Sequence, residues 1–259
     1  MKIEIVYGEL ANLLGEHGTQ QLLAHTFGED QLIRTRFPEL PRFFQGDVDF
    51  VYMGPMPESV QRLVLERWRE HRDAFEQAIQ KGTVFFFSGN AMDLVGRSIR
   101  YVEYETVEGL GIFPFDTICR RYDRQNEVVD ARFNEIPVMG FRSQFTTHTG
   151  DAGKYPFLEV LCGSGMNPDI DTEGVRLRNF FGTSLLGPFL VLNPMFSKWL
   201  FRQFGFSGPL AFEEELLKAE TQRRLDFEES FGKKIKAPRL LRNYLKKEKE
   251  ILDDVAKKK

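Results

Sequence analysis

The order of apolar and polar residues over the first 90 positions predicts alternating strands and helices. Apolar, β-branched or aromatic segments predict strands at residues 3–7, 32–37, 50–53 and 83–87. Apolar residues at helical spacing predict helices at 18–27 and 57–79, and Pro57 and Gly82 suit the two ends of the second helix. Segment Val84–Phe87 is apolar at every position, which is typical of a strand buried on both faces of a parallel sheet.

The pattern changes after residue 100. Short strand-like segments alternate with Gly, Asn, Asp and Thr from 100 to about 175, which predicts a region rich in strands and turns. A helix is expected at 194–204, and two charged helices at 210–231 and 238–255 with a hinge between them. Strands that alternate with helices imply a layered α/β fold with right-handed crossovers.

Charge is distributed unevenly along the 259 residues. The net charge is −3, but residues 233–259 hold eleven Lys or Arg and four Asp or Glu, so this tail carries +7 and the rest carries −10. An acidic body with a basic tail suits an interaction with a partner, although a solvated helix is the commoner reason for such a tail. Nothing in this balance points to nucleic acid as a partner.

The number of cysteines and the lengths of the apolar runs indicate which cellular compartment and which cofactors to expect. Cys119 and Cys162 form neither a disulfide framework nor a metal-ligand spacing, so we expect no metal and no cofactor. Residues 1–7 lack the pattern of a signal peptide. No apolar run reaches the roughly 18 residues of a membrane span. The expectation is a cytoplasmic protein without a membrane span.

The turn after the apolar strand at 83–87 carries the main candidate chemistry. Phe87-Ser88-Gly89-Asn90 ends a buried strand, presents one small polar residue and leads into a helix, which is the layout of a nucleophile elbow. Gly89 suits a positive φ in such a turn. Ser88 is therefore a candidate nucleophile, and the alternative is a serine that caps the following helix.

Several short motifs, taken in order, resemble the class I glutamine amidotransferases of the cobyric acid synthase (CobB/CobQ) type. The elbow resembles the Ile-Cys-Gly-Gly-Tyr-Gln-Leu-Leu-Gly segment of this family. The other matching segments are Asn12–Gly18, Glu108–Ile112, Gly140-Phe141, Gly163–Asn167, Glu173–Val175, Gly182–Pro188 and Asn193-Pro194. The order of the motifs is most similar to the GatD subunits of lipid II isoglutaminyl synthase, and it covers residues 1 to about 205.

The resemblance implies a fold and a division of the chain. The fold class is α/β: a three-layer, flavodoxin-like, mostly parallel sheet with helices on both faces, followed by a C-terminal helical extension. The amidotransferase-like domain would span 1–205, and the charged helical extension 206–259.

The sequence departs from the family at the residues that perform catalysis. In the family, a cysteine thiolate attacks the glutamine amide and a histidine handles the proton. Here Ser88 stands at the cysteine position and Leu186 at the histidine position. Asn90 replaces a glycine of the elbow, and Met53–Pro57 replaces a glycine-rich segment that supplies oxyanion donors, so two prolines remove two N–H groups. The segment Gly140–Gln144 replaces Gly-Phe-Glu-Asn-His.

A basic cluster at 120–124 supplies the candidate ligand contacts. The resemblance implies that an arginine near this offset contacts glutamine, and Arg124 matches best, with Arg121 second. A guanidinium can bind a carboxylate with two hydrogen bonds, so a glutamine-like ligand can be held without turnover. Gly54 and Gly89 are the expected backbone contributors. A solvated loop is the alternative for the arginines.

Three functions from different classes remain open. The first is a non-catalytic, GatD-like partner of a Mur-ligase-like (MurT-like) subunit in the amidation of cell-wall precursors. The second is a hydrolase that uses Ser88 with His148 as a relocated base, and the alternative for His148 is a surface loop. The third is a glutaminase that works despite the lost residues. Cys119 and Cys162 are expected to be small buried residues.

Overall fold

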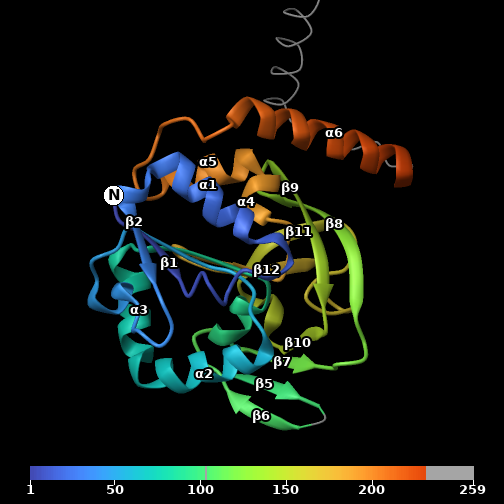
Figure 1. Ribbon diagram of the computed structural model, residues 1–259. Coiled ribbons are helices and arrows are strands. Elements are labelled where there is room, and N and C mark those ends of the chain that lie inside the picture. The colour runs from blue at the N-terminus through green and yellow to red at the C-terminus, as the bar shows by residue number, and fades with distance from the viewer. Residues whose placement is uncertain (103, 232–259) are drawn as a thin grey trace, which may run out of the picture.

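The computed structural model of the chain describes residues 1–102 and 104–231, which form two sheets and the helices around them (Figure 1). The large sheet has the strand order β2-β1-β3-β4-β13-β12-β11-β8-β9. Its strands are β1 (Ile3–Val6), β2 (Leu32–Thr35), β3 (Phe50–Met53), β4 (Val84–Ser88), β8 (Gln125–Phe133), β9 (Ile136–Gln144), β11 (Pro156–Cys162), β12 (Thr172–Leu177) and β13 (Phe180–Thr183). The strands from β2 to β13 along this order pair in parallel, and those from β13 to β9 pair antiparallel.

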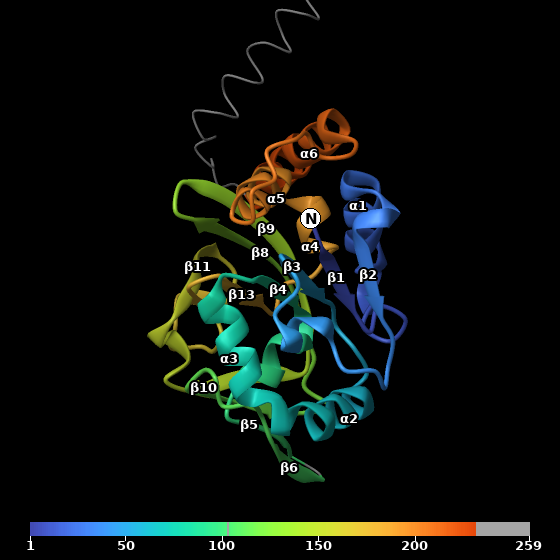
Figure 2. The same ribbon diagram turned by 90° about the vertical axis from the view of Figure 1, so that its left-hand side faces the viewer.

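Helices cover both faces of the large sheet, as Figures 1 and 2 show. One face carries α1 (His17–Phe27), α4 (Phe189–Leu192) and α5 (Pro194–Arg202), and the other carries α2 (Glu58–Trp68) and α3 (Arg72–Lys81). The last described helix, α6 (Glu213–Phe231), packs on α4 and α5. The predicted three-layer α/β fold is therefore confirmed, with its parallel part around the elbow.

The apolar strand β4 illustrates how the sequence sets these layers. Side chains alternate between the faces of a strand. Val84 and Phe86 accordingly join the core beneath α1 and α5, whereas Phe85 and Phe87 join the core beneath α2 and α3. All four are fully buried, which confirms the prediction of a strand covered on both faces.

A second, smaller sheet lies at the end of the molecule opposite α6 in both views. Its order is β10-β7-β5-β6, with β5 (Ser98–Tyr101), β6 (Glu105–Glu108), β7 (Phe115–Cys119) and β10 (Thr146–Gly150). Together with β8, β9, β11 and β12 it confirms the prediction that the middle of the chain is rich in strands.

Two helical predictions need correction. The helix expected at 57–79 is interrupted by a 3₁₀ turn at Arg69–His71, where the chain passes from α2 to α3. The segment after the elbow, Gly89–Val95, is a 3₁₀ helix rather than an α-helix. The helix expected at 238–255 falls outside the described residues. The division of the chain at residue 205 stays a prediction, although α6 rests on the body.

Candidate functional site

The elbow at the end of β4 has the backbone geometry that the sequence predicts. Ser88 is extended, and Gly89 has φ +60, the left-handed region that favours glycine. A Cβ on Gly89 would lie 2.6 Å from Cβ of Pro55 and 2.8 Å from Cδ2 of Leu186. Glycine is therefore required here both by conformation and by space.

The Ser88 side chain points into the protein. It is completely buried, and it makes no hydrogen bond that caps the following 3₁₀ helix. Its recorded partner is the Tyr52 hydroxyl, with 3.5 Å between the two oxygens. Because Tyr52 donates its own hydrogen to Glu16 over 2.7 Å, Ser88 faces a phenol oxygen rather than a base.

Glu16 is the buried centre of this region, and its role was not predicted from the sequence. Its Oε2 accepts from the hydroxyls of Tyr52 and Thr19, and its Oε1 accepts from the backbone N–H groups of Gly187 and Phe189 over 3.2 and 3.0 Å. Burial raises the pKa of the Glu16 carboxyl, and these hydrogen bonds offset part of the rise. The sequence signals were the place of Glu16 within the matching segment Asn12–Gly18 and its position as a lone acidic residue between apolar Leu13-Leu14 and helix α1.

Leu186 lies beside the elbow, where the resemblance places the family's histidine. It is 2% exposed, and its backbone pairs with Phe141 of β9 in both directions, over 2.9 and 3.0 Å. The side chain contacts the Gly89 position. An aliphatic side chain cannot exchange a proton with Ser88. Leu186 therefore contributes packing beside the elbow and no acid–base chemistry.

The Asn90 side chain occupies the backbone hydrogen-bonding groups of Met56, in the segment 55–57 beside the elbow. Its Oδ1 accepts the N–H of Met56 over 2.9 Å, and its Nδ2 donates to the Met56 carbonyl over 2.7 Å. Pro55 and Pro57 have no N–H to offer. All three residues from 55 to 57 therefore lack a backbone donor for a substrate oxygen. Gly54 packs instead against the Ala11 carbonyl, which would lie 2.5 Å from an added Cβ.

A cleft with a volume of about 200 Å³ opens beside the elbow. Its lining comes from the segment 55–61, the elbow, β7, β9 and the turn that follows β13. Gly89, Asn90, Leu186 and Arg124 are among the lining residues, and Ser88 is not. The polar lining also includes Glu58, Gln61, Asp93, Ser143, Gln144, Thr146 and Ser184. Cys119, far from the elbow in sequence, lines the cleft as well.

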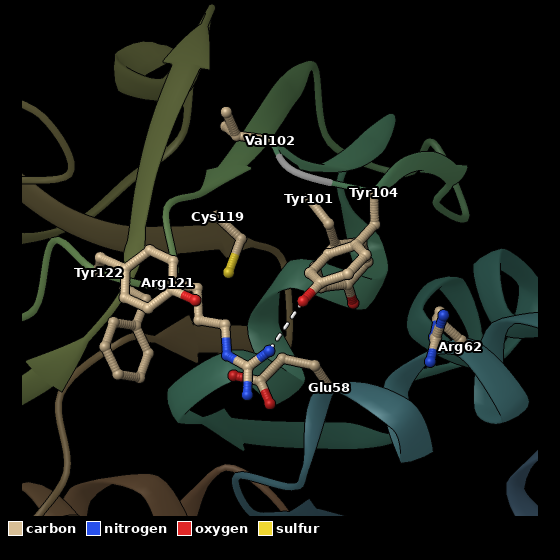
Figure 3. Close-up of a pocket in the computed structure, with 9 residues that line it drawn as sticks. Glu58, Arg62, Tyr101, Val102, Tyr104, Cys119, Arg121 and Tyr122 are labelled. Carbon is tan, nitrogen blue, oxygen red and sulfur yellow. Dashed lines mark hydrogen bonds between the residues drawn. The ribbon is translucent and has the colours of Figure 1, made fainter.

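The two candidate arginines lie in different places. Arg124 lines the cleft, with its guanidinium 4.8 Å from the centre of the Phe145 ring. Arg121 lines a neighbouring pocket of about 410 Å³ and donates to the Tyr104 hydroxyl over 2.8 Å (Figure 3). Glu58, Cys119 and Phe145 belong to both cavities. Of the two arginines, Arg124 is thus the one placed to meet a ligand beside the elbow.

Arg142, from the altered Gly140–Gln144 motif, is a buried structural residue. It has no exposed surface, it forms an ion pair with buried Glu173, and its Nη1 donates to Glu127 over 2.7 Å and to the Ser164 carbonyl over 2.6 Å. Glu173 also accepts from Ser184 N–H over 2.8 Å. This network joins β9, β12 and the turn after β13 beneath the cleft.

The expectation for His148 as a surface residue is wrong. His148 lies on β10 and is completely buried, because its ring packs against Phe115 in the small sheet. Its Nε2 contacts Asp93 Oδ1 over 2.7 Å, so its recorded partner is a carboxylate and not Ser88. Cys119 is buried as expected, and Cys162 is partly exposed.

The described residues contain no group of three or more His, Cys, Asp or Glu side chains arranged to hold a metal ion. Within 1–102 and 104–231, no helix combines the length and the apolar character needed to cross a membrane.

The fold is that of glutamine amidotransferases. A solved glutamine amidotransferase structure superposes with a TM-score of 0.53 at 12% identity, covering 80% of this chain and all of that one. The PurLQS structure from Thermotoga maritima gives 0.52 at 10% identity, covering 86% and 98%. Identities this low establish the shared fold alone.

In sequence, the chain is similar to the GatD subunit of lipid II isoglutaminyl synthase (glutamine-hydrolyzing). It is 23% identical to that protein from Streptococcus pneumoniae over 237 residues, 85% of this chain and 88% of the relative. It is 22% identical to the Staphylococcus aureus protein over 176 residues, 68% and 72% of the two chains. A scan against models of known protein families finds no match.

Proposed function

We propose that this protein is a GatD-like subunit of the CobB/CobQ type that has lost glutaminase activity and serves as a partner of a Mur-ligase-like (MurT-like) enzyme in cell-wall precursor amidation. The observation that carries the proposal is the burial of Ser88 outside the cleft lining. A nucleophile has to reach a substrate carbonyl, and the side chain of Ser88 is buried and does not line the cleft.

The surroundings of Ser88 support the loss of activity. Leu186 offers no proton acceptor, and the N–H of Met56 is already bonded to Asn90. A single missing oxyanion donor lowers kcat by about 10²–10³ in a serine protease. With the family's nucleophile and base replaced and the donors of segment 55–57 unavailable, we expect no acyl-enzyme to form.

The cleft retains the means to bind. Arg124 presents a guanidinium that can pair with a carboxylate, and the remaining lining supplies polar side chains for a glutamine-like ligand. The similarity to GatD proteins over 85% of the chain supports retention of their subunit role. The acidic body and the basic segment 233–259 would supply charge for docking on the partner.

The test uses the protein together with a Mur-ligase-like (MurT-like) protein. Copurification of the two and a higher melting temperature of the ligase in the complex are expected. In an amidation assay, ammonium chloride should support product formation, and glutamine should not replace it. Amidation driven by glutamine and dependent on this chain would overturn the proposal, as would a ligase that neither binds nor is stabilised.

The Ser88-dependent hydrolase finds less support. It requires a base at the serine, and the His148 Nε2 atom is engaged with Asp93. Among the described residues, the recorded hydrogen-bond partner of the Ser88 hydroxyl is Tyr52. Burial and the Glu16 charge raise the pKa of the Tyr52 hydroxyl well above its usual value, so this group keeps its proton and cannot serve as the base.

A further inference from the structure

The Asp93–His148 pair is a buried polar pair to which the proposed function gives no specific role. Asp93 is 1% exposed and His148 is completely buried. The Asp93 Oδ1 atom accepts from Thr117 Oγ1 over 3.2 Å and lies 2.7 Å from His148 Nε2. Since a carboxylate only accepts, His148 carries its proton on Nε2 toward Asp93 and fixes the orientation of the carboxylate.

The second carboxylate oxygen lacks a partner. Among the described residues, no hydrogen bond reaches Asp93 Oδ2, although the atom is buried. Leaving a buried polar atom without a hydrogen-bond partner is unfavourable, and more so when the group is charged. Asp93 is at the same time one of the residues that line the cleft. A donor supplied by a ligand in the cleft would satisfy it.

We propose that Asp93 recognises the protonated amine of a small amino-acid-like ligand bound in the cleft, and that His148 is its positioning residue. The inference rests on the ligand-binding part of the proposed function. A cationic amine suits a carboxylate acceptor better than a neutral donor does, because charge-assisted hydrogen bonds are stronger. Arg124, in the same lining, would take the carboxylate of the ligand.

The size of the cleft restricts the ligand. Its volume of about 200 Å³ is below the range of about 300–1,000 Å³ that is usual for drug-sized ligands, so a free amino acid fits the space better than a nucleotide or a peptide. Glu58 is the other carboxylate of the lining, and it is exposed on the first turn of α2. Water competes for an exposed carboxylate, so selectivity for the amine should come from buried Asp93.

The experiment compares two probes that differ only in the amine. Isothermal titration calorimetry on the full chain would measure L-glutamine and 4-carbamoylbutanoate, which is glutamine without its α-amino group. The unsubstituted protein should bind L-glutamine about tenfold to a hundredfold more tightly. In D93N this preference should fall to near unity, because the glutamine affinity drops while the affinity for 4-carbamoylbutanoate stays.

Two further variants act as comparisons. D116N removes the same charge from the neighbouring strand, where Asp116 pairs with Arg97 and Ser98 away from the cleft, and it should keep the full preference. E58Q should keep the preference as well. Loss of the preference in E58Q rather than D93N would overturn the inference, as would equal binding of both probes, or binding of neither, by the unsubstituted protein.

A measurement on the unsubstituted protein covers the case in which D93N does not fold. His148 is the only fully buried one of the four histidines, so its ring ¹⁵N signals can be assigned by their protection from solvent. L-glutamine should shift the His148 signals, and 4-carbamoylbutanoate should not. Identical shifts, or none with either probe, would refute the assignment. Neither experiment involves ammonia release or the partner, so both can fail while the loss of glutaminase activity and the role as a partner stand.

Discussion

Replacement of Glu16 by alanine should destabilise the protein by about 3–5 kcal/mol, because stranded buried donors cost about 1–3 kcal/mol each. Glu16 Oε1 is the acceptor for the backbone N–H groups of Gly187 and Phe189, and these cannot turn away. The hydroxyls of Thr19 and Tyr52 can rotate and lose less. The space vacated by the side chain adds a cavity cost to the two stranded N–H groups.

Glu16→Gln separates hydrogen bonding from charge. The amide keeps one oxygen for the two backbone donors, and the two hydroxyls can accept from its NH₂ group, so the expected cost is about 1 kcal/mol or less. Urea denaturation followed by circular dichroism gives both free energies of unfolding. Glu9→Ala is the matched control, because exposed Glu9 accepts one backbone N–H, from Phe37 over 2.9 Å. If both variants at Glu16 lost the same free energy of unfolding, the claim that unpaired backbone N–H groups cause most of the loss in Glu16→Ala would be refuted.

Further predictions concern α6 and the elbow. Burial raises the pKa of Glu220 to about 7 from 4.5, so its stabilising contribution is full below pH 4.5 and is lost as the pH rises through 7. In the unsubstituted protein, the free energy of unfolding should fall between pH 5 and pH 8 as Glu220 loses its proton. In Glu220→Gln this fall should be about 2–3 kcal/mol smaller, as measured by urea titration at both pH values. A fluorophosphonate probe should not label Ser88, and labelling abolished by Ser88→Ala would revive the hydrolase. The double variant Ser88→Cys/Leu186→His should still release no ammonia from glutamine above background, because Pro55, Met56 and Pro57 offer no free N–H to a substrate oxygen.

The fold could be predicted because its signals are local. The uninterrupted apolar run of Val84–Phe87 specified a strand covered on both faces, and the left-handed turn at Gly89 followed from residue type. The break between α2 and α3 escaped prediction because Arg69 and Glu70 are good helix formers and His71 is no helix breaker, so no residue type marks the 3₁₀ turn at 69–71.

The site was harder to predict because it depends on contacts between distant segments. Glu16 meets Gly187 across 171 positions, and His148 meets Asp93 across 55. Neither residue has a sequence neighbour that reveals its partner. His148 lies among threonines, so its surroundings in sequence suggested exposure, whereas strand pairing with β7 buries it.

The residues that replace the family's catalytic groups around the elbow pack against and hydrogen-bond with their new neighbours. This indicates a well-packed structural region rather than an active site that has lost single residues at random. Leu186 fills the space against Gly89 and Pro55, and Asn90 satisfies both polar groups of Met56. Scattered loss of function would leave buried groups unsatisfied at this point, and such groups are costly. Among the described residues, the buried unpartnered atoms nearest the cleft are Asp93 Oδ2, His148 Nδ1 and Arg142 Nε, and none of them belongs to Leu186 or Asn90. The Asp93–His148 pair is therefore the part of the cleft that is best placed to bind a ligand group. The elbow lines the cleft without taking part in chemistry.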